Sequence, residues 1–252
     1  MAAPGAVIIT GAAGGIGAAV ARRFARDGYN VALGYATSES ATRAVAADCV
    51  ELGVEAMLVQ GDVGDDAVCR RIAAEVQARF GRIDVLVNNA ARTAFAPHSD
   101  LEALTGEIFL DLYRNNVVSA YQMTRAVAGI MKEAGSGAVV NVGSRAGISG
   151  AGSSMAYAAS KAALHTLTKS LARSLAPLIR VNCVSPGWVD SDWHYRESEE
   201  KGRKAKAAYS AKAVLKRVTE PENVASAIHW VATGAPAMTG EVITMDAGMH
   251  LA

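Results

Sequence analysis

The chain has 252 residues, of which 51% are hydrophobic and 19% are charged, and its formal net charge is +1. This length and apolar content can build a sizeable core and exclude disorder of the whole chain, and the balanced charge gives no reason to expect a nucleic acid or a membrane surface as partner. There is no run of about 18 apolar residues and no basic stretch before an apolar one, so we expect neither a transmembrane helix nor a signal peptide, but a cytoplasmic protein.

Cysteine and histidine give no sign of a disulfide framework or a metal site. Cys49, Cys69 and Cys183 are odd in number, widely spaced and embedded in apolar segments, which predicts buried free thiols. The five histidines show no ligand spacing, so we predict no metal.

The first predicted strand, residues 6–10, runs directly into a glycine-rich turn that contains Gly11, Gly14, Gly15 and Gly17. An alanine-rich helix follows and ends near residues 27–28. This order is the context of a dinucleotide-binding loop, because glycine lets the backbone approach a pyrophosphate and the helix N-terminus offers unpaired N–H groups. The alternative is an ordinary glycine turn, since the chain holds 24 glycines; the context favours the cofactor loop.

The same alternation of strand and helix continues to the end of the chain. Further strands are predicted at residues 31–35, 55–60, 83–87, 138–142, 180–184 and 242–245, and helices at 39–52, 65–80, 108–133, 156–171 and 219–233, the last with a capping-box sequence over 219–222. Such alternation predicts a parallel sheet with right-handed crossovers. We therefore expect one doubly wound α/β domain of the Rossmann type over residues 1–252, with seven strands and helices on both faces.

Polar residues follow the predicted strands. Thr10, Tyr35, Asp62 and Asn88 end the first four, and the fifth leads to Ser144. A doubly wound sheet binds its ligand beyond the carboxyl ends of its strands. These side chains should meet at one edge of the sheet.

Tyr157 and Lys161 stand four residues apart in a predicted helix without Gly or Pro. Residues i and i+4 share a helix face, so a phenol and an ammonium can reach the same small molecule. Of the seven tyrosines, only Tyr157 has a Lys at this spacing.

Two further segments need an explanation. Asn115 and Asn116 are poor helix formers inside a predicted helix, which points either to a functional asparagine or to a kink that its side chain satisfies. Residues 188–217 break the pattern and predict a lid over the site, with Trp188, Trp193 and His194 as candidate substrate contacts, packing being the alternative.

The predicted lid is rich in positive charge. Residues 196–217 hold eight Lys or Arg against three Glu. A solvated helical face is the simpler interpretation, and a landing site for an anionic substrate or an acidic carrier protein is the alternative.

These motifs make the whole chain resemble the short-chain dehydrogenase/reductase family, in particular members similar to 3-oxoacyl-carrier-protein reductases. The matching residues are Thr10-Gly11-x-x-x-Gly15-Ile16-Gly17, Asp62-Val63, Asn88-Asn89-Ala90, Asn116, Ser144, Tyr157-x-x-x-Lys161 and Pro186-Gly187. The chain departs from the family at Ala91, Ser191 and Ala247, where the family has Gly, Thr and Gly; no reacting group is lost.

The resemblance implies an NADPH-dependent oxidoreductase that reduces a ketone, or oxidises the matching secondary alcohol. It implies Tyr157 as proton donor, Ser144 as the residue that holds the substrate oxygen, Lys161 as the ligand of the nicotinamide ribose, and Asn116, rather than Asn115, as the residue that holds a relay water. A tyrosine with a pKa of about 10 is a poor acid–base catalyst alone, and an ammonium about 4 Å away is worth up to about 3 pK units at an effective dielectric near 20. We therefore expect Lys161 to lower the pKa of Tyr157.

Cofactor contacts follow from the same resemblance. They are expected from Gly11, Ala13, Gly14, Gly15, Ile16, Gly17, Tyr35, Thr37, Ser38, Asp62, Val63, Asn89, Ala90, Tyr157, Lys161, Pro186, Gly187, Val189 and Ser191. The second strand ends without an acidic residue before Glu39, while Thr37 and Ser38 offer hydroxyls and Arg43 is within reach if the turn is tight. This favours NADP(H) over NAD(H). Asp62 is expected to bond the adenine.

The substrate expectation is a 3-oxoacyl thioester or a related small carbonyl compound, with an acyl carrier protein as a further candidate partner. The alternatives are a sugar, steroid or alcohol dehydrogenase of the same family, or a nucleotide-sensing scaffold without activity. The complete set of Asn116, Ser144, Tyr157 and Lys161 favours the enzyme. The resemblance also implies a homotetramer, formed through the helices that carry Asn116 and Tyr157.

Overall fold

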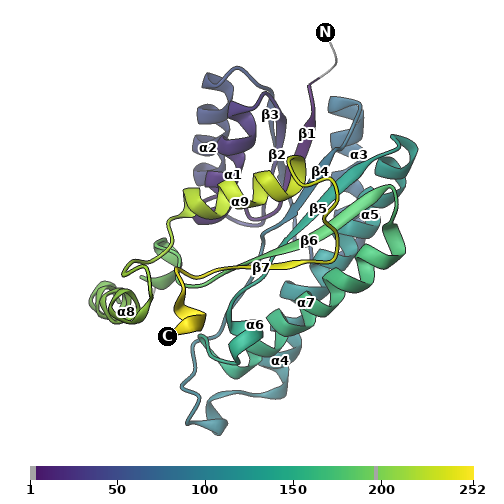
Figure 1. The fold of residues 1–252 in the computed structure, drawn as a ribbon. Helices are drawn as coiled ribbons and strands as arrows, with labels where there is room; N and C mark the ends of the chain where they lie inside the picture. The colour runs from purple at the N-terminus through teal and green to yellow at the C-terminus, as the bar shows by residue number, and fades with distance from the viewer. Residues whose placement is uncertain (1–3, 196–197) are drawn as a thin grey trace.

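A seven-stranded parallel sheet forms the centre of the computed structural model, which describes residues 4–195 and 198–252 (Figure 1). Its strands are β1 Ala6–Ile9, β2 Asn30–Tyr35, β3 Ala56–Gln60, β4 Val85–Asn88, β5 Gly137–Val142, β6 Ile179–Pro186 and β7 Val242–Met245. They lie in the order β3-β2-β1-β4-β5-β6-β7. The predicted doubly wound α/β fold with a seven-stranded parallel sheet is confirmed.

Helices cover both faces of the sheet (Figure 1). They are α1 Gly15–Arg26, α2 Glu39–Glu51, α3 Asp66–Phe80, α4 Gly106–Tyr113, α5 Ser119–Glu133, α6 Ala146–Ser149, α7 Met155–Leu175, α8 Glu199–Lys212 and α9 Pro221–Thr233, with the short turns η1 Leu101–Ala103, η2 Arg114–Val118, η3 Asp192–His194 and η4 Met249–Leu251. None of the helices among the described residues has the length and apolar character needed to cross a membrane.

Alternate residues of the strands feed two core layers. Val7 and Ile9 of β1 pack with α1 and α9, whereas Ile8 packs on the other face with α3, α5 and α7. Successive side chains of a strand point to opposite faces, so a strand buried on both sides is apolar throughout. The continuous apolar runs in the sequence have this cause.

The chain reverses direction across the sheet at β1. From β1 it moves outward through β2 to β3, and it then returns to β4 on the other side of β1. The loops after β1 and β4 therefore leave the sheet in opposite directions. A crevice opens between them at the carboxyl ends, where doubly wound sheets bind their ligands.

The structure refines three local expectations. The predicted helix 108–133 is two α-helices joined by the π-helical turn η2, which contains Asn115 and Asn116. The sequence pattern indicated a capping box over residues 219–222, whereas Glu220 and Asn223 form the box in the structure. The last helix therefore begins one residue later than predicted. The predicted lid holds a full helix, α8, whose first turn is capped by the Ser198 hydroxyl.

Candidate active site

A cleft of about 790 Å³ lies at the carboxyl edge of the sheet. Residues that follow β1 to β6 line it, and residues from η3 and α8 close it on the far side. Of the strand-end residues singled out in the sequence, Thr10, Tyr35, Asp62 and Ser144 line this cleft. Asn88 does not line it, because its side chain is buried and donates to Asn141 Oδ1 at 2.9 Å.

The glycine-rich turn forms the wall of the cleft nearest β1. Gly11 and Gly15 have φ of +66° and +50°, in the left-handed region that favours glycine. A Cβ on Gly17 would stand 2.2 Å from the Gly11 carbonyl oxygen, while one on Gly14 would meet nothing within 4 Å. Gly14 lines the cleft and Gly17 does not, so Gly17 serves the packing of α1 against the turn.

Thr10 holds the turn to the segment after β4. Its Oγ1 accepts hydrogen bonds from the backbone N–H groups of Asn89 (3.0 Å) and Ala90 (2.9 Å). The Asn89 side chain donates in return to the carbonyl oxygens of Thr10 (3.0 Å) and Gly11 (2.8 Å). These bonds fix the two sides of the crevice relative to each other. Thr10 also lines the cleft, although we did not predict it as a cofactor contact.

Ser144, Tyr157 and Lys161 lie together on one wall of the cleft. Tyr157 stands in the first turn of α7, where the Ser154 hydroxyl caps the helix by accepting from the Tyr157 N–H at 3.2 Å. Burial raises the pKa of the Tyr157 phenol to about 12, partly offset by its hydrogen bond with Ser144. Tyr157 is therefore a protonated acid at neutral pH.

The Lys161 ammonium is directed at the backbone rather than at the phenol oxygen. Its Nζ donates to the Val142 carbonyl oxygen at 2.8 Å and lies 5.7 Å from the centroid of the Tyr157 ring. Burial lowers the pKa of Lys161 to about 8. The expectation that Lys161 lowers the pKa of Tyr157 is wrong for this structure, because desolvation of the phenol outweighs a charge that is turned away from it.

Asn116 stands behind the cleft wall. Its side chain is buried; Nδ2 donates to the Arg92 carbonyl oxygen (3.0 Å) and to Ser160 Oγ (2.9 Å), and Oδ1 accepts from the Arg92 N–H (2.8 Å). It thus joins the segment after β4 to α7. Asn115, which we set aside, lines the cleft and bonds back to Asp111. The structure gives the Asn116 side chain a positioning role.

The opposite end of the cleft is lined by Tyr35, Thr37, Ser38, Asp62 and Val63. Asp62 Oδ1 accepts from the Gly64 N–H at 2.8 Å, and its Oδ2 lies 3.3 Å from Arg114 Nη2.

Arg43 does not reach this end of the cleft. Its guanidinium is tied to Glu39 one helical turn away, with contacts of 2.6 and 2.9 Å. The condition under which we expected Arg43 within reach of this end is therefore not met.

Aromatic side chains of the predicted lid close the other end. The rings of Trp188 and His194 stack with centroids 3.7 Å apart, and Tyr209 of α8 lies 6.3 Å from Trp188. Burial lowers the pKa of His194 to about 4, so the imidazole is neutral. Trp188, Trp193 and His194 all line the cleft.

Much of the positive charge of the lid is already paired. Arg203 and Lys204 bind Glu199 and Glu200 along α8, and Lys206 binds Asp190. Arg196 and Glu197, which belong to the charge excess, lie outside the described residues.

The structure brings the predicted site residues together with two exceptions, Gly17 and Asn116, which support the cleft from behind. It also adds residues that sequence reasoning did not place at the site, among them Arg92, Phe95, Arg145 and Tyr209. Thr10, which was expected at this edge but not as a cofactor contact, lines the cleft as well. Arg145 had one available signal, its place directly after Ser144. Tyr209 had none, since only the fold of α8 brings it to the site.

Comparisons with known proteins agree with this geometry. Residues 11–250 match the family model described as "Enoyl-(Acyl carrier protein) reductase". One relative is named as "putative ketoacyl reductase 2" of the granaticin polyketide synthase of Streptomyces violaceoruber. It is 37% identical to this chain over 246 residues, which cover 97% of this chain and 95% of the relative. A 3-oxoacyl-[acyl-carrier-protein] reductase of Staphylococcus epidermidis is 32% identical, covering 97% and 98%.

Solved structures of reductases are also similar to this chain over nearly its whole length. A variant of actinorhodin polyketide ketoreductase with NADPH superposes with a TM-score of 0.87 at 32% identity, covering 98% of this chain and 97% of the other. Levodione reductase superposes with a TM-score of 0.91 at 29% identity, covering 98% of both. The chain belongs to the short-chain dehydrogenase/reductase family, close to the 3-oxoacyl-carrier-protein reductases, and is an oxidoreductase acting on carbonyl or CH–OH groups.

Proposed function

We propose that the protein reduces a ketone with NADPH and that Tyr157 delivers the proton. The observation that carries this proposal is that Ser144, Tyr157 and Lys161 share one cleft with the glycine-rich turn. A bound nicotinamide would supply the hydride.

The residues present fit a nicotinamide dinucleotide. The open Cβ direction at Gly14 and the positive φ of Gly15 leave room for a pyrophosphate beside the N-terminus of α1. Tyr35, Thr37, Ser38 and Asp62 would hold the adenosine end, and Lys161 the nicotinamide ribose. Pro186, Gly187, Val189 and Ser191 line the side where the nicotinamide ring would lie.

The role of each catalytic residue follows from its surroundings. Ser144 would hold the substrate oxygen, and the hydrogen-bonded Tyr157 would donate its proton to the same atom. A phenol pKa of about 12 keeps that proton in place at neutral pH until an alkoxide, a far stronger base, develops. Lys161, positive below its pKa of about 8, would stabilise the phenolate that remains.

The preference for NADPH rests on the end of β2. The carboxylates that line the cleft within the described residues are those of Asp62 and Asp192, and neither follows β2. A 2′-phosphate would therefore meet the hydroxyls of Thr37 and Ser38 without repulsion. Comparison of kcat/KM for NADPH and NADH tests this, and equal values would contradict it.

The substrate class that we propose is a 3-oxoacyl thioester or a related small ketone. The polyketide and fatty-acid reductases among its relatives support this class. An acyl carrier protein is the weaker candidate partner, because Arg203, Lys204 and Lys206, three of the basic side chains of α8 that would receive it, are engaged by Glu199, Glu200 and Asp190.

The test is NADPH oxidation against a panel of 3-oxoacyl thioesters and small ketones, with Tyr157→Phe as the inactive control. We expect turnover by the wild type and a loss of about 100- to 10,000-fold in the variant. Tight NADPH binding without turnover across the panel would instead support a nucleotide-sensing scaffold.

We further propose that the protein is a single-domain cytoplasmic homotetramer. Phe109, Leu110 and Tyr113 on α4, Tyr121 on α5 and Ile148 on α6 are all more than two-fifths exposed and provide an apolar face near α4 and α5. Light scattering at micromolar concentration checks the assembly, and a monomer mass would contradict it. The three free, buried cysteines fit a reducing compartment.

A further inference from the structure

The ion pairs at the cleft are loose compared with those elsewhere. Among the ion pairs recorded between described residues, the three longest contacts are Arg145–Asp246 at 3.9 Å, Arg92–Asp111 at 3.6 Å and Arg114–Asp62 at 3.3 Å. Each includes a residue that lines the cleft. An arginine bound to a carboxylate normally approaches to about 2.7–2.9 Å. The guanidinium groups at the cleft therefore lack the close carboxylate that most other paired arginines have.

Arg145 is the most enclosed of the three. It directly follows Ser144, and its backbone N–H is fixed on the Pro186 carbonyl oxygen at 2.8 Å. Its side chain is 22% exposed, whereas the Arg92 and Arg114 side chains are 58% and 50% exposed. A partly desolvated guanidinium gains more from a close anion than an exposed one does.

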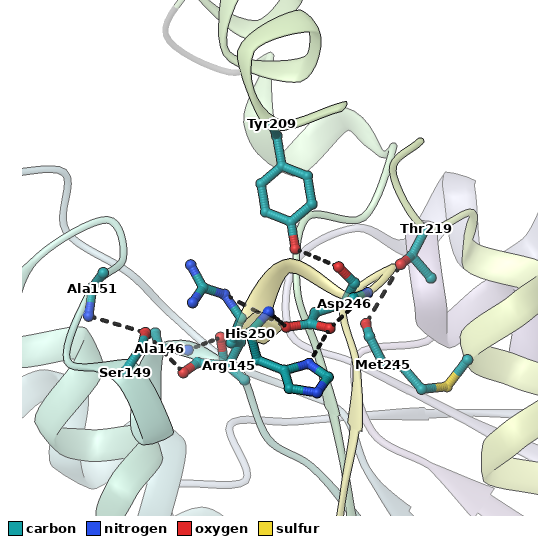
Figure 2. Close-up of polar contacts among 11 residues, drawn as sticks. Arg145, Ala146, Ser149, Ala151, Tyr209, Thr219, Met245, Asp246 and His250 are labelled. Carbon is teal, nitrogen blue, oxygen red and sulfur yellow. Dashed lines mark hydrogen bonds and ion pairs between the residues drawn. The ribbon is translucent and has the colours of Figure 1, made fainter. Parts of the chain in front are cut away.

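Asp246 does not provide that close anion, because its carboxylate is directed at the C-terminal segment (Figure 2). Its Oδ1 accepts from the Gly248 N–H (3.1 Å) and from His250 Nδ1 (2.8 Å), and its Oδ2 accepts from the His250 N–H (2.8 Å). The Asp246 side chain is 1% exposed and is held from this side. The carboxylate therefore balances the Arg145 charge only at a distance.

The charges lining the substrate end of the cleft are mostly positive. Arg92, Arg145 and Lys161 line it, against the single carboxylate of Asp192 at the lid. Lys161 donates to the Val142 carbonyl oxygen and is assigned above to the nicotinamide ribose and the Tyr157 phenolate. Arg145 therefore stands as the enclosed cation next to the residue that would hold the ketone oxygen.

We propose that Arg145 recognises a carboxylate on the substrate, and that, of the two substrate classes proposed above, the substrate is a small ketone, a compact oxo acid, rather than a 3-oxoacyl thioester. This inference rests on the proposed reduction of a ketone at Ser144 and Tyr157. Arg145 and Ser144 are consecutive residues that both line the cleft, and we therefore place the recognised carboxylate within a few bonds of the reacting carbonyl. The phosphate of a carrier-bound thioester is separated from the ketone by the whole pantetheine arm and does not meet this requirement. The fork of N–H donors on a guanidinium matches a carboxylate in two hydrogen bonds.

Matched substrates test the proposal. Short oxo acids with one, two or three carbons between ketone and carboxylate are compared with their methyl esters, by NADPH oxidation. We expect the best acid to exceed its ester in kcat/KM by about 10- to 100-fold, the gain typical of a charge-assisted hydrogen bond. A wild type that prefers the esters overturns the proposal, and so does turnover of 3-oxoacyl thioesters or neutral small ketones with none of the acids. Absence of turnover with the acids, the esters, the thioesters and the neutral ketones alike contradicts the proposed function itself.

Variants then assign the preference to the guanidinium. Arg145→Gln should remove the preference for the acid, with a loss for the acid at least about tenfold greater than the loss for the ester. Arg145→Lys should restore part of the preference, and the Kd of NADPH should remain close to that of the wild type. The control is Arg22→Gln on α1, another partly exposed arginine with an aspartate partner, which should keep the wild-type acid-to-ester ratio. Equal losses for acid and ester in Arg145→Gln would show a structural role and overturn the proposal.

A measurement on the wild type covers the case in which these variants fold poorly. Short saturated carboxylates should inhibit reduction of an oxo ester competitively, and the corresponding amides, which have the same shape but no charge, should inhibit at least about tenfold more weakly. Equal inhibition by acid and amide would overturn the proposal without any substitution.

Discussion

The two ends of the cleft are built in different ways. At the cofactor end, the wall consists of the turn after β1, held by Thr10 and Asn89, and of the residues that follow β2 and β3. At the substrate end, the wall consists of large side chains from separate segments, including Trp188, Arg145 and Tyr209. The cofactor end is thus fixed by glycine spacing and strand order, whereas the substrate end depends on which side chains the lid and the loops deliver.

This difference explains why a family resemblance describes one end better than the other. A turn that needs glycine leaves a pattern in the sequence, because few other residues adopt its backbone conformation. A wall of side chains leaves no spacing rule, since its members come from unrelated places in the chain. Substitutions at the two ends of the cleft should therefore change different properties, such as the stability of the fold, the turnover rate or the cofactor preference.

The largest effect is expected at Lys161, where both ends meet. Lys161→Met should reduce kcat by about 100- to 10,000-fold, because it removes the charge beside the proton donor.

The wild-type rate should also depend on pH. Burial lowers the Lys161 pKa to about 8, so the ammonium is present below pH 8 and is lost above it. We expect kcat to fall by about tenfold per pH unit above that point. A flat profile up to pH 10 would contradict the assignment.

Two glycines of the turn should respond oppositely. In Gly17→Ala the new Cβ would lie 2.2 Å from a backbone oxygen, and we expect a loss of about 1–3 kcal/mol or more in the free energy of unfolding. Gly14→Ala, the matched control, has open space at this position and an extended backbone, and should leave stability nearly unchanged. Urea unfolding of both variants measures the difference. Equal losses in the free energy of unfolding would show that close packing of the backbone does not determine the structure of the glycine-rich turn.

The sequence predicted the strands well because each is a short apolar run between turns, and β7 was predicted to the residue. It also indicated that Asn115 and Asn116 disturb their helix, yet a π-helical turn gives no pattern distinct from an ordinary helix. The Arg145–Asp246 contact lay out of reach for another reason. It joins the loop after β5 to the segment after β7, and only the assembled sheet makes these neighbours.

A smaller effect, on stability, is expected for substitution of Asn116, which lies behind the cleft wall. Asn116→Ala would remove three hydrogen bonds and leave the Arg92 N–H and carbonyl without these partners, for a loss of about 1–3 kcal/mol in stability. Asn115→Ala removes bonds to the neighbouring Asp111 only and should cost less. If thermal unfolding shows Asn115→Ala to be the more damaging, the positioning role assigned to Asn116 is wrong.

The smallest effect is expected at Arg43, which the sequence left within reach of the cofactor only if the turn is tight and which the structure ties to Glu39. The pair is exposed on α2, and exposed ion pairs of this spacing contribute about 0.3–0.5 kcal/mol. Arg43→Ala should therefore leave the ratio of kcat/KM for NADPH to that for NADH within about twofold of the wild type. Ser38→Asp provides the contrast, because a carboxylate beside the 2′-phosphate should shift this ratio toward NADH by about tenfold or more. A fall of that size in Arg43→Ala would mean that the arginine leaves Glu39 to hold the phosphate. The adenosine end would then depend on a charged side chain of α2 as well as on the hydroxyls of Thr37 and Ser38.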